Sequence, residues 1–225
     1  MIDEVKPLKL SRSKLDAFLH CQRCFWLEVH GKAPPIDMAM GVYNVLDSIQ
    51  KRYYDRYRND GLPPLLKDKI PLKLADANLV EKLRSGVSFD DEKLKAVLWG
   101  KMDDCFVDGK GRLVVMDNKT SSSGPNEEYE EGYRFQLDVY GYLLMKNGFK
   151  VAPYGYLVYY IPDKESDFNN GIKFKVETRK FKLDANRILD IFRRAVETAR
   201  EKKPPARHEE CEMCIWMHEM DGIER

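Results

Sequence analysis

The sequence predicts an α/β fold, with a helix-rich amino-terminal part followed by two strands, a helix, two more strands and a last helix. Three observations support it. Two short apolar runs flank a glycine-rich turn, and apolar residues then recur at helical spacing. Near the end, a long amphipathic stretch stops at a proline pair. The 225 residues, 43% of them hydrophobic, contain no low-complexity linker or repeat, so we expect one domain.

The amino-terminal part is predicted to be mainly helical. Its first helix should begin with Ser13 as the cap and Asp16 in the capping-box position. A second helix should run from about residue 40 to residue 58, where charged residues are frequent. Proline pairs at 34–35 and 63–64 mark the boundaries of these elements, because proline interrupts a helix.

The middle of the chain is predicted to form a β-hairpin. Residues 101–107 and 112–116 have the composition of strands, and Asp108-Gly109-Lys110-Gly111 between them has the composition of a tight turn. If this turn sets the register, Asp103 faces Met116 on the opposite strand.

The remaining elements follow from their periodicity. A helix around Gln136 is indicated by apolar residues at helical spacing, namely Tyr133, Leu137, Tyr140, Leu143 and Leu144. Residues 154–161 and 172–183 are predicted strands joined by a polar loop at 162–171. The last helix should span 184–203, with its apolar stripe packed on the sheet.

Two acids and a lysine come together in this arrangement. Asp103 lies within one residue of facing Asp117, and Lys119 shares a strand face with Asp117. Carboxylates hold Mg²⁺ or Mn²⁺, and such an ion lowers the pKa of a bound water and neutralises charge on a phosphate. A lysine can position that water or stabilise the transition state. The grouping suits phosphodiester hydrolysis, and the alternative is a set of ordinary polar residues beside a hairpin.

Three motifs occur in the order Gly100-x-x-Asp103, Asp117-x-Lys119 and Gln136-x3-Tyr140. Together they resemble the RecB-like branch of the PD-(D/E)XK nuclease superfamily. The segment from Ser11 to Cys21 is similar to the opening helix of RecB-like and CRISPR-associated exonucleases. The resemblance implies a restriction-endonuclease-like core, with a mixed central β-sheet flanked by helices. The expected domain, 1–225, then comprises a helical portion at 1–90, a catalytic core at 95–203 and a cysteine segment at 204–225.

The resemblance also implies roles for particular residues. It assigns metal binding to Asp103, Asp117 and the backbone carbonyl of Asn118, catalysis to Lys119, and steadying of the site or the nucleic acid to Gln136 and Tyr140.

The chain departs from the family pattern on an early helix. Many relatives carry a histidine or glutamate metal ligand there, after a glycine, whereas this chain has Asp47 after Gly41. Asp47 is the best substitute as a metal ligand. The alternative is a solvated helix residue that pairs with Lys51 or Arg52, in which case metal binding is weak or activity is lost.

Four cysteines form a second constellation. Cys21-x2-Cys24 and Cys211-x2-Cys214 have metal-ligand spacing at opposite ends of the chain, so four thiolates can complete one metal shell. The alternatives are buried apolar cysteines or disulfides. Cys105, inside a predicted strand, is expected to be core.

The occupant of the four cysteines is left open by their spacing. The family resemblance favours a 4Fe-4S cluster, and a structural Zn²⁺ is the alternative. Related exonucleases usually supply one cysteine early and three late, so the even split here is a departure. His20, His208 and His218 are close enough in sequence to be alternative ligands, although four cysteines already complete the usual shell.

Three tyrosines stand among basic residues in the second predicted helix. Tyr53, Tyr54 and Tyr57 lie among Lys51, Arg52, Arg56 and Arg58, a mixture that can stack bases and contact phosphates of single strands. The alternative is that these tyrosines pack on the core.

The resulting hypothesis is a cytoplasmic, Mg²⁺- or Mn²⁺-dependent deoxyribonuclease, an exonuclease or end-processing enzyme acting on single-stranded DNA or duplex ends. No leader or long apolar run is evident, so secretion and membrane spanning are unsupported and the thiols should stay reduced. No phosphate-loop motif occurs, so a helicase, CRISPR or repair partner would supply any ATP hydrolysis. The alternative is a catalytically weak nucleic-acid-binding or assembly module.

Overall fold

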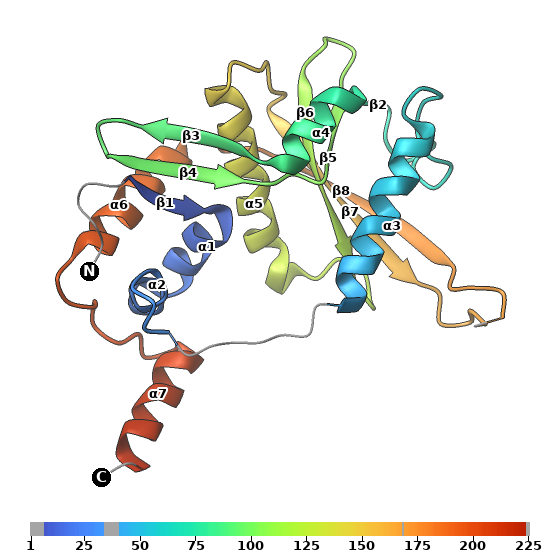
Figure 1. Cartoon of the computed structure of the whole chain (residues 1–225). Coiled ribbons are helices and arrows are strands. Elements are labelled where there is room, and N and C mark those ends of the chain that lie inside the picture. The colour runs from blue at the N-terminus through green and yellow to red at the C-terminus, as the bar shows by residue number, and fades with distance from the viewer. Residues whose placement is uncertain (1–6, 34–40, 168, 224–225) are drawn as a thin grey trace. The chain divides into compact units, whose positions relative to one another are not determined.

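The computed structural model describes residues 7–33, 41–167 and 169–223 (Figure 1). The chain forms two compact units. The terminal unit comprises residues 1–37, 89–99 and 187–225, and the central unit comprises residues 38–88 and 100–186. The expectation of one domain from 1 to 225 stays a prediction. No helix in the described ranges has the length and apolarity needed to cross a membrane.

The central unit is built on a five-stranded mixed sheet. Its strands are β2 (Lys73–Leu74), β5 (Asp104–Val107), β6 (Leu113–Thr120), β7 (Tyr154–Pro162) and β8 (Phe174–Lys182), in that spatial order. The pair β6 and β7 is parallel, and the other pairs are antiparallel. The predicted mixed sheet flanked by helices, as in restriction endonucleases, is confirmed.

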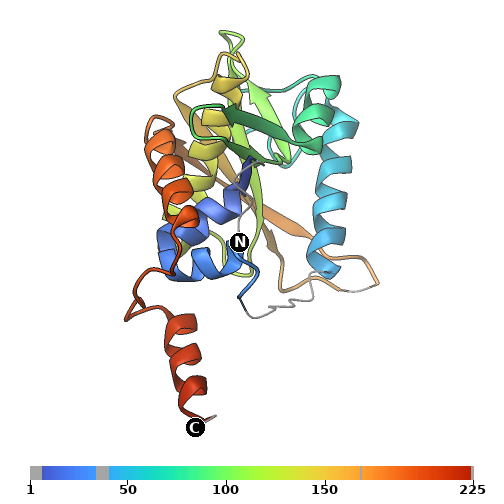
Figure 2. The same ribbon diagram turned by 60° about the vertical axis from the view of Figure 1, so that its left-hand side comes forward.

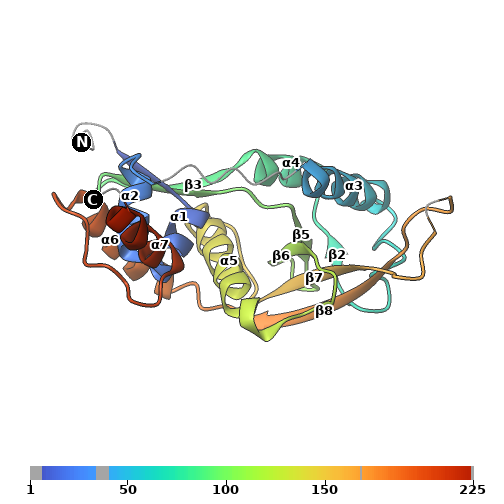
Figure 3. The same cartoon turned by 90° about the horizontal axis from the view of Figure 1, so that it is seen from below.

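Helices cover both faces of this sheet. They are α3 (Gly41–Tyr57), α4 (Ala77–Ser85) and α5 (Glu127–Lys146). Tyr54 of α3 contacts Asn118, and Gln136 of α5 contacts Asp117. Neighbouring residues of a strand point to opposite faces, so α3 and α5 lie on opposite sides of β6 (Figure 3). A core between the sheet and α3 includes Tyr54, Phe106, Val114, Met116 and Val158.

The hairpin register differs from the prediction by one residue. Asp104, and not Asp103, pairs with Met116. The turn is three residues long because Asp108 and Arg112 already pair through their backbones, and Gly111 adopts a φ of 68° to close it. The Asp108 carboxylate also accepts hydrogen bonds from the backbone N–H groups of Lys110 and Arg112, which stabilises this shorter turn.

The terminal unit contains the helices α1 (Arg12–His20), α2 (Gln22–Val29), α6 (Arg187–Arg200) and α7 (Glu212–Ile223). It also holds β1 (Leu8–Ser11) and most of β3 (Val87–Asp91) and β4 (Ala96–Gly100), in the order β1-β4-β3. Helix α6 lies alongside α1 and α2 (Figure 2). The indole of Trp26 in α2 donates a hydrogen bond of 2.9 Å to the carbonyl of Glu201, just after α6.

The predicted cap of the first helix is wrong. Ser11 caps α1, and its Oγ accepts a hydrogen bond of 3.2 Å from the backbone N–H of Lys14. Ser11 ends β1 with an extended backbone, the conformation that an N-cap residue needs, whereas Ser13 already lies within the helix. The second predicted helix is α3, and Met40, its expected first residue, lies outside the described residues.

Candidate active site

The carboxyl end of β6 places an acid and a lysine on one face of the sheet. Lys119 Nζ lies 2.6 Å from Asp117 Oδ2, and it also donates to Gln136 Oε1 at 2.9 Å. The Gln136 amide nitrogen donates to Asp117 Oδ1 at 2.6 Å and to the Tyr140 hydroxyl at 2.9 Å. Gln136 therefore contacts three other predicted site residues, Asp117, Lys119 and Tyr140.

The chemistry of the Gln136 amide explains this linkage. Its carbonyl end can only accept and faces an ammonium, whereas its nitrogen end can only donate and faces a carboxylate. Gln136 and Tyr140 are one helical turn apart on α5, so both reach the same strand end. The site residues Asp117 and Gln136 are buried, which strengthens these contacts.

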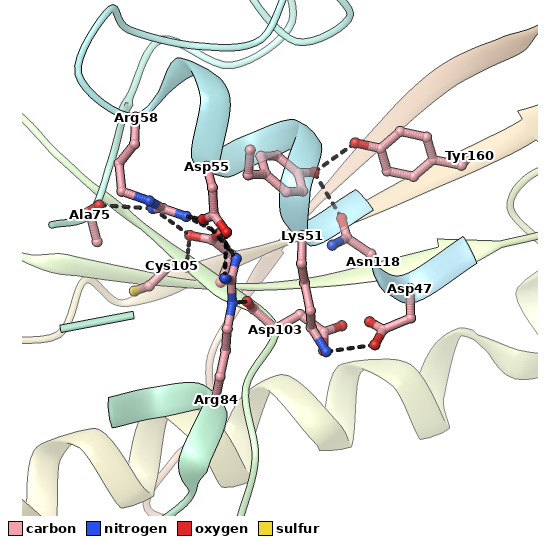
Figure 4. A network of polar contacts seen from close by, with 12 residues as sticks. Asp47, Lys51, Asp55, Arg58, Ala75, Arg84, Asp103, Cys105, Asn118 and Tyr160 are labelled. Carbon is pink, nitrogen blue, oxygen red and sulfur yellow. Dashed lines mark hydrogen bonds and ion pairs between the residues drawn. The ribbon is translucent and has the colours of Figure 1, made fainter. Parts of the chain in front are cut away.

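Asp103 enters the site from the segment just before β5. Its carboxylate lies 3.2 Å from Lys51 Nζ, and Lys51 in turn lies 2.7 Å from Asp47 Oδ2 (Figure 4). Burial raises the pKa of Asp103 to about 6, and the charge of Asp117 adds to this effect while Lys51 opposes it. The carboxylates of Asp103 and Asp117 are therefore close enough to repel each other.

The side chain of Asn118 points away from this group. The Tyr54 hydroxyl donates to Asn118 Oδ1 at 2.8 Å, and the Tyr160 hydroxyl donates to that of Tyr54 at 2.9 Å. Burial raises the pKa of both tyrosines, so both hydroxyls keep their protons. Because the Asn118 side chain lies on the opposite face of the strand, only its backbone can contribute to the site formed by Asp117 and Lys119.

A buried ion-pair network that the sequence did not predict supports Asp103. Asp104 is fully buried, and its carboxylate accepts from Arg58 at 2.6 and 3.1 Å and from Arg84 at 3.1 Å. The Nε of Arg84 also donates to the backbone carbonyl of Asp103 at 2.8 Å. The exposed carboxylate of Asp55 contacts both Arg58 and Arg84 (Figure 4). The only signal in the sequence was the pair of adjacent acids, Asp103 and Asp104.

Gly100 makes room for the α5 residues. A Cβ at this position would lie 3.1 Å from the ring of Tyr140 and 3.4 Å from the side chain of Leu143. The contact with Tyr140 is tighter than ordinary van der Waals packing, so a side chain at this position would require the ring to shift. The glycine of the Gly100-x-x-Asp103 motif therefore acts through space, by admitting the ring of Tyr140.

The donor set fits a hard divalent cation. Two carboxylates that repel each other, Asp103 and Asp117, lie beside the backbone of Asn118, and oxygen ligands of this kind suit Mg²⁺ and Mn²⁺. Within the described residues, only the four cysteines form a group of three or more metal-ligating side chains whose atoms all lie within 4.8 Å of one another, so Asp47, Asp103 and Asp117 do not form so tight a group. The Lys51 ammonium lies between Asp47 and Asp103, so Asp47 could join an ion only after Lys51 moves.

The four predicted cysteines form one cluster. Their sulfurs all lie within 4.8 Å of one another, with Cys21 3.6 Å from Cys214, and Cys24 3.6 Å from Cys211 and 3.7 Å from Cys214. Burial raises the pKa of the Cys21 and Cys24 thiols, so a bound metal would displace their protons. Cys105 is fully buried in the central unit, as expected.

The histidines that stood near the cysteines in sequence do not join this cluster within the described chain. His20 contacts the carbonyl of Asp16, His208 contacts the backbone of Glu210, and His218 contacts Arg207.

The proteins that are similar to this chain include a curated relative and a solved structure. The curated relative, one subunit of an ATP-dependent helicase/nuclease from Clostridium beijerinckii (strain ATCC 51743 / NCIMB 8052), is 37% identical over 79 residues, which are 34% of this chain and 6% of that protein. The chain therefore spans only a small part of that relative. The crystal structure of SSO0001 aligns with 97% of this chain and 87% of that chain, with 16% sequence identity and a TM-score of 0.48.

A family model matches more than half of the chain. The sequence model of the PD-(D/E)XK nuclease superfamily matches residues 68–218, about two thirds of the chain. The matched range includes Asp103 and also Asp117, Lys119 and Gln136, which contact one another at the end of β6. On these grounds the chain belongs to the PD-(D/E)XK nuclease superfamily.

Proposed function

We propose that this chain is a Mg²⁺- or Mn²⁺-dependent deoxyribonuclease that hydrolyses phosphodiester bonds at single-stranded DNA or duplex ends. The observation that carries the proposal is the Gln136 amide, which holds Lys119 at 2.9 Å and Asp117 at 2.6 Å. A lysine and a carboxylate held in this way are in position before substrate arrives, so little reorganisation is needed during the reaction.

Each residue then has a defined task. Asp103, Asp117 and the backbone carbonyl of Asn118 would hold the divalent cation, and Asp47 would complete the set once Lys51 moves away. When bound, such an ion lowers the pKa of a water and neutralises charge on the phosphate. Lys119 hydrogen-bonds the attacking water or a phosphate oxygen, and the ring of Tyr133, 4.2 Å from Lys119 Nζ, covers the amine on one side.

The test is cleavage of end-labelled single- and double-stranded DNA with Mg²⁺, Mn²⁺ or EDTA. Lys119→Ala should lower metal-dependent cleavage by at least roughly a hundredfold, because it removes a charge placed at the reacting phosphate. Lys110→Ala is the matched control, since Lys110 is exposed at the tip of the β5–β6 hairpin. Equal loss in both variants, or full activity of Lys119→Ala, would refute the assignment. Comparing 5′ and 3′ labels separates exonucleolytic from endonucleolytic attack.

A second candidate is a non-cleaving nucleic-acid-binding or assembly module. One observation favours it: the Lys51 ammonium lies between Asp47 and Asp103, where it supplies the positive charge that a metal would otherwise bring. A folded wild-type protein that binds DNA but cleaves none with any divalent metal would establish this candidate. Lys51→Met would then be expected to strengthen Mn²⁺ binding, because the competing cation is gone.

The four cysteines would hold a resident metal group with a structural role. The family resemblance favours a 4Fe-4S cluster. The sulfur spacing of 3.6 to 3.7 Å favours one tetrahedral Zn²⁺, because bonds of about 2.3 Å to a single ion put the sulfurs about 3.8 Å apart. A cluster binds each thiolate to a different iron and needs a wider cage. Iron and zinc contents and the visible absorption of anaerobically purified protein decide between them.

The cellular setting extends the same proposal. The chain carries no phosphate-loop motif, and the relative from Clostridium beijerinckii belongs by its name to an ATP-dependent helicase/nuclease. We infer that the nuclease acts in the cytoplasm beside an ATP-driven helicase or a CRISPR or repair protein. Co-purification of a tagged chain with such a motor is the corresponding measurement.

A further inference from the structure

A pocket of about 240 Å³ lies beside helix α3 in the central unit. Leu46 and Ile49 contribute aliphatic surface, and Tyr53, Tyr160 and Phe174 contribute aromatic rings. Its volume is below the range of roughly 300 to 1,000 Å³ that is usual for drug-sized ligands. A single flat ring system is an occupant of suitable size and shape, because aromatic side chains offer faces on which such a ring can stack.

Two guanidinium groups line the same pocket without a partner. Arg52 and Arg56 are exposed, and neither forms an ion pair or hydrogen bond with any residue that the structure describes. This contrasts with Arg58, the residue just after this helix, which forms ion pairs with Asp55 and Asp104. No acidic residue lines the pocket. The ligand is therefore expected to be anionic next to its flat ring.

Helix α3 carries this pocket and part of the candidate active site on adjacent faces. Lys51 contacts the carboxylates of both Asp103 and Asp47, which lies one turn earlier on α3, whereas Gln50, next to Lys51, lines the pocket. Gln50 also donates a hydrogen bond of 3.2 Å to Thr120 at the end of β6. The pocket and the candidate active site therefore meet the same end of β6.

The polar contacts around Tyr160 make the same connection. The hydroxyl of Tyr160, a pocket residue, donates to that of Tyr54, which donates to Asn118 between the two site residues of β6. A rigid chain of hydrogen bonds thus runs from the wall of the pocket to the strand that carries Asp117 and Lys119.

We propose that the pocket binds one unstacked nucleobase of a DNA single strand, while Arg52 and Arg56 contact the phosphates that flank it. Stacking surface combined with unpaired basic side chains is the combination by which proteins hold single strands. The proposal rests on the proposed nuclease function and adds a position where the substrate strand is held. Binding of one base there fixes the register of the strand relative to the scissile phosphate. A duplex end would have to release a base to use the pocket.

The first test is binding of a fluorescent single-stranded oligonucleotide to the full chain in EDTA, across a range of salt. Arg52→Ala/Arg56→Ala should weaken binding at least tenfold and reduce the salt slope by about 1.4, since each phosphate contact on a single strand contributes about 0.7. The matched control is Lys110→Ala/Lys150→Ala, which removes the same charge from exposed lysines before the amino-terminal ends of β6 and β7. Equal effects of the two double variants would overturn the proposal.

The second test detects the base itself. A 2-aminopurine is moved along the oligonucleotide, and its fluorescence should change on binding at one position, because stacking on tyrosine or phenylalanine alters its emission. Ile49→Glu should remove that change, since a carboxylate in the pocket repels the strand, and the 46% exposure of Ile49 lets the variant fold. The proposal would be overturned if the 2-aminopurine fluorescence of the wild-type complex did not depend on the position of the base. It would also be overturned if Ile49→Glu gave the same fluorescence change as the wild type, and a protein partner would then be the occupant to test.

The two proposals fail separately. If Arg52→Ala/Arg56→Ala keeps both metal-dependent cleavage and its affinity for the strand, the pocket proposal is refuted and the nuclease proposal stands. If that variant loses strand binding and the wild type cleaves no DNA with any metal, the nuclease proposal is refuted and the pocket proposal stands. A wild type that binds no single strand removes the pocket proposal outright.

Discussion

At the scale of single residues, Gln136 is the position on which the candidate site depends most. It is 5% exposed, and its amide satisfies an ammonium, a carboxylate and a hydroxyl at once. We predict that Gln136→Leu lowers cleavage by roughly tenfold to a hundredfold. It should also lower the free energy of unfolding by about 1 to 3 kcal/mol, because buried Asp117 loses a donor.

Steady-state cleavage and urea unfolding measure these two effects of Gln136→Leu. Tyr140→Phe is the control, since it keeps the ring and removes only the hydroxyl that faces Gln136. A loss in Tyr140→Phe as large as that in Gln136→Leu would show that the amide is not the organising group.

The pKa of Asp103 makes the stability of the metal-free protein depend on pH. Burial, with the charge of Asp117, raises this pKa to about 6, whereas an unfolded aspartate has a pKa of about 3.9. The folded chain therefore takes up a proton between these values that the unfolded chain does not, so stability falls as the pH rises from about 4 to about 6. Asp103→Asn should be more stable than wild type at pH 7.5 by at most about 3 kcal/mol, and this gain should vanish at pH 4.

Urea unfolding of Asp103→Asn and wild type, free of Mg²⁺ and Mn²⁺, measures this difference. A variant that is less stable than wild type at pH 7.5, or equally shifted at both pH values, would contradict the prediction.

The candidate residues could be predicted because their chemistry is carried by short motifs. Asp117 and Lys119 share a strand face, and Gln136 and Tyr140 share a helix face, so local periodicity alone brings each pair together. Lys51 was foreseen only as a partner of Asp47. Its contact with Asp103 joins α3 to a segment about fifty residues later, and no local pattern reports such a distance.

At the scale of elements, the limits of prediction lie in turns. The β5–β6 register was off by one residue because a three-residue turn and a four-residue turn have nearly the same composition. The β3–β4 connection was missed because it contains no glycine. Lys95 adopts a φ of 46° there, and the Asp91 carboxylate accepts hydrogen bonds from the backbone of Lys93 and Leu94. The hydrogen bonds of Asp91 stabilise this turn without the glycine by which a turn is usually recognised in a sequence.

Helix α3, helix α4 and strand β5 are joined by the buried carboxylate of Asp104. Arg58 follows α3, Arg84 belongs to α4, and both contact Asp104 at the start of β5. We predict that Arg58→Met lowers the free energy of unfolding by about 3 to 5 kcal/mol, because the buried carboxylate of Asp104 loses one of its two arginine partners.

The double variant Arg58→Met/Asp104→Asn should recover part of this loss, since the unpaired charge is removed. Denaturant unfolding of both variants measures the difference. A double variant no more stable than Arg58→Met alone would mean that the loss comes from packing of the arginine stem.

At the scale of the whole molecule, the cysteine cluster joins residues from both ends of the sequence. Cys21 and Cys214 are separated by 193 positions, yet their sulfurs lie 3.6 Å apart. The two Cys-x2-Cys pairs predicted this meeting because each pair supplies half of a four-ligand shell. The two-unit organisation was not predicted, because the terminal unit is assembled from three separate stretches of chain.

Metal binding by this cluster should therefore stabilise the terminal unit as a folded body. A ligand set that exists only in the folded chain converts metal-binding free energy into folding free energy. We predict that Cys214→Ser loses the bound metal and that limited proteolysis then cuts first within residues 7–33 or 187–223, while the five-stranded sheet of the central unit resists.

Cys105→Ser is the control, because Cys105 is buried in the sheet and lies outside the cluster. Metal analysis, thermal unfolding and mapping of the first cuts test this directly. An unchanged proteolytic pattern in metal-free Cys214→Ser would mean that the terminal unit is held by its apolar packing, with Phe25 and Trp26 buried in α2, and that the cluster has a role other than stability.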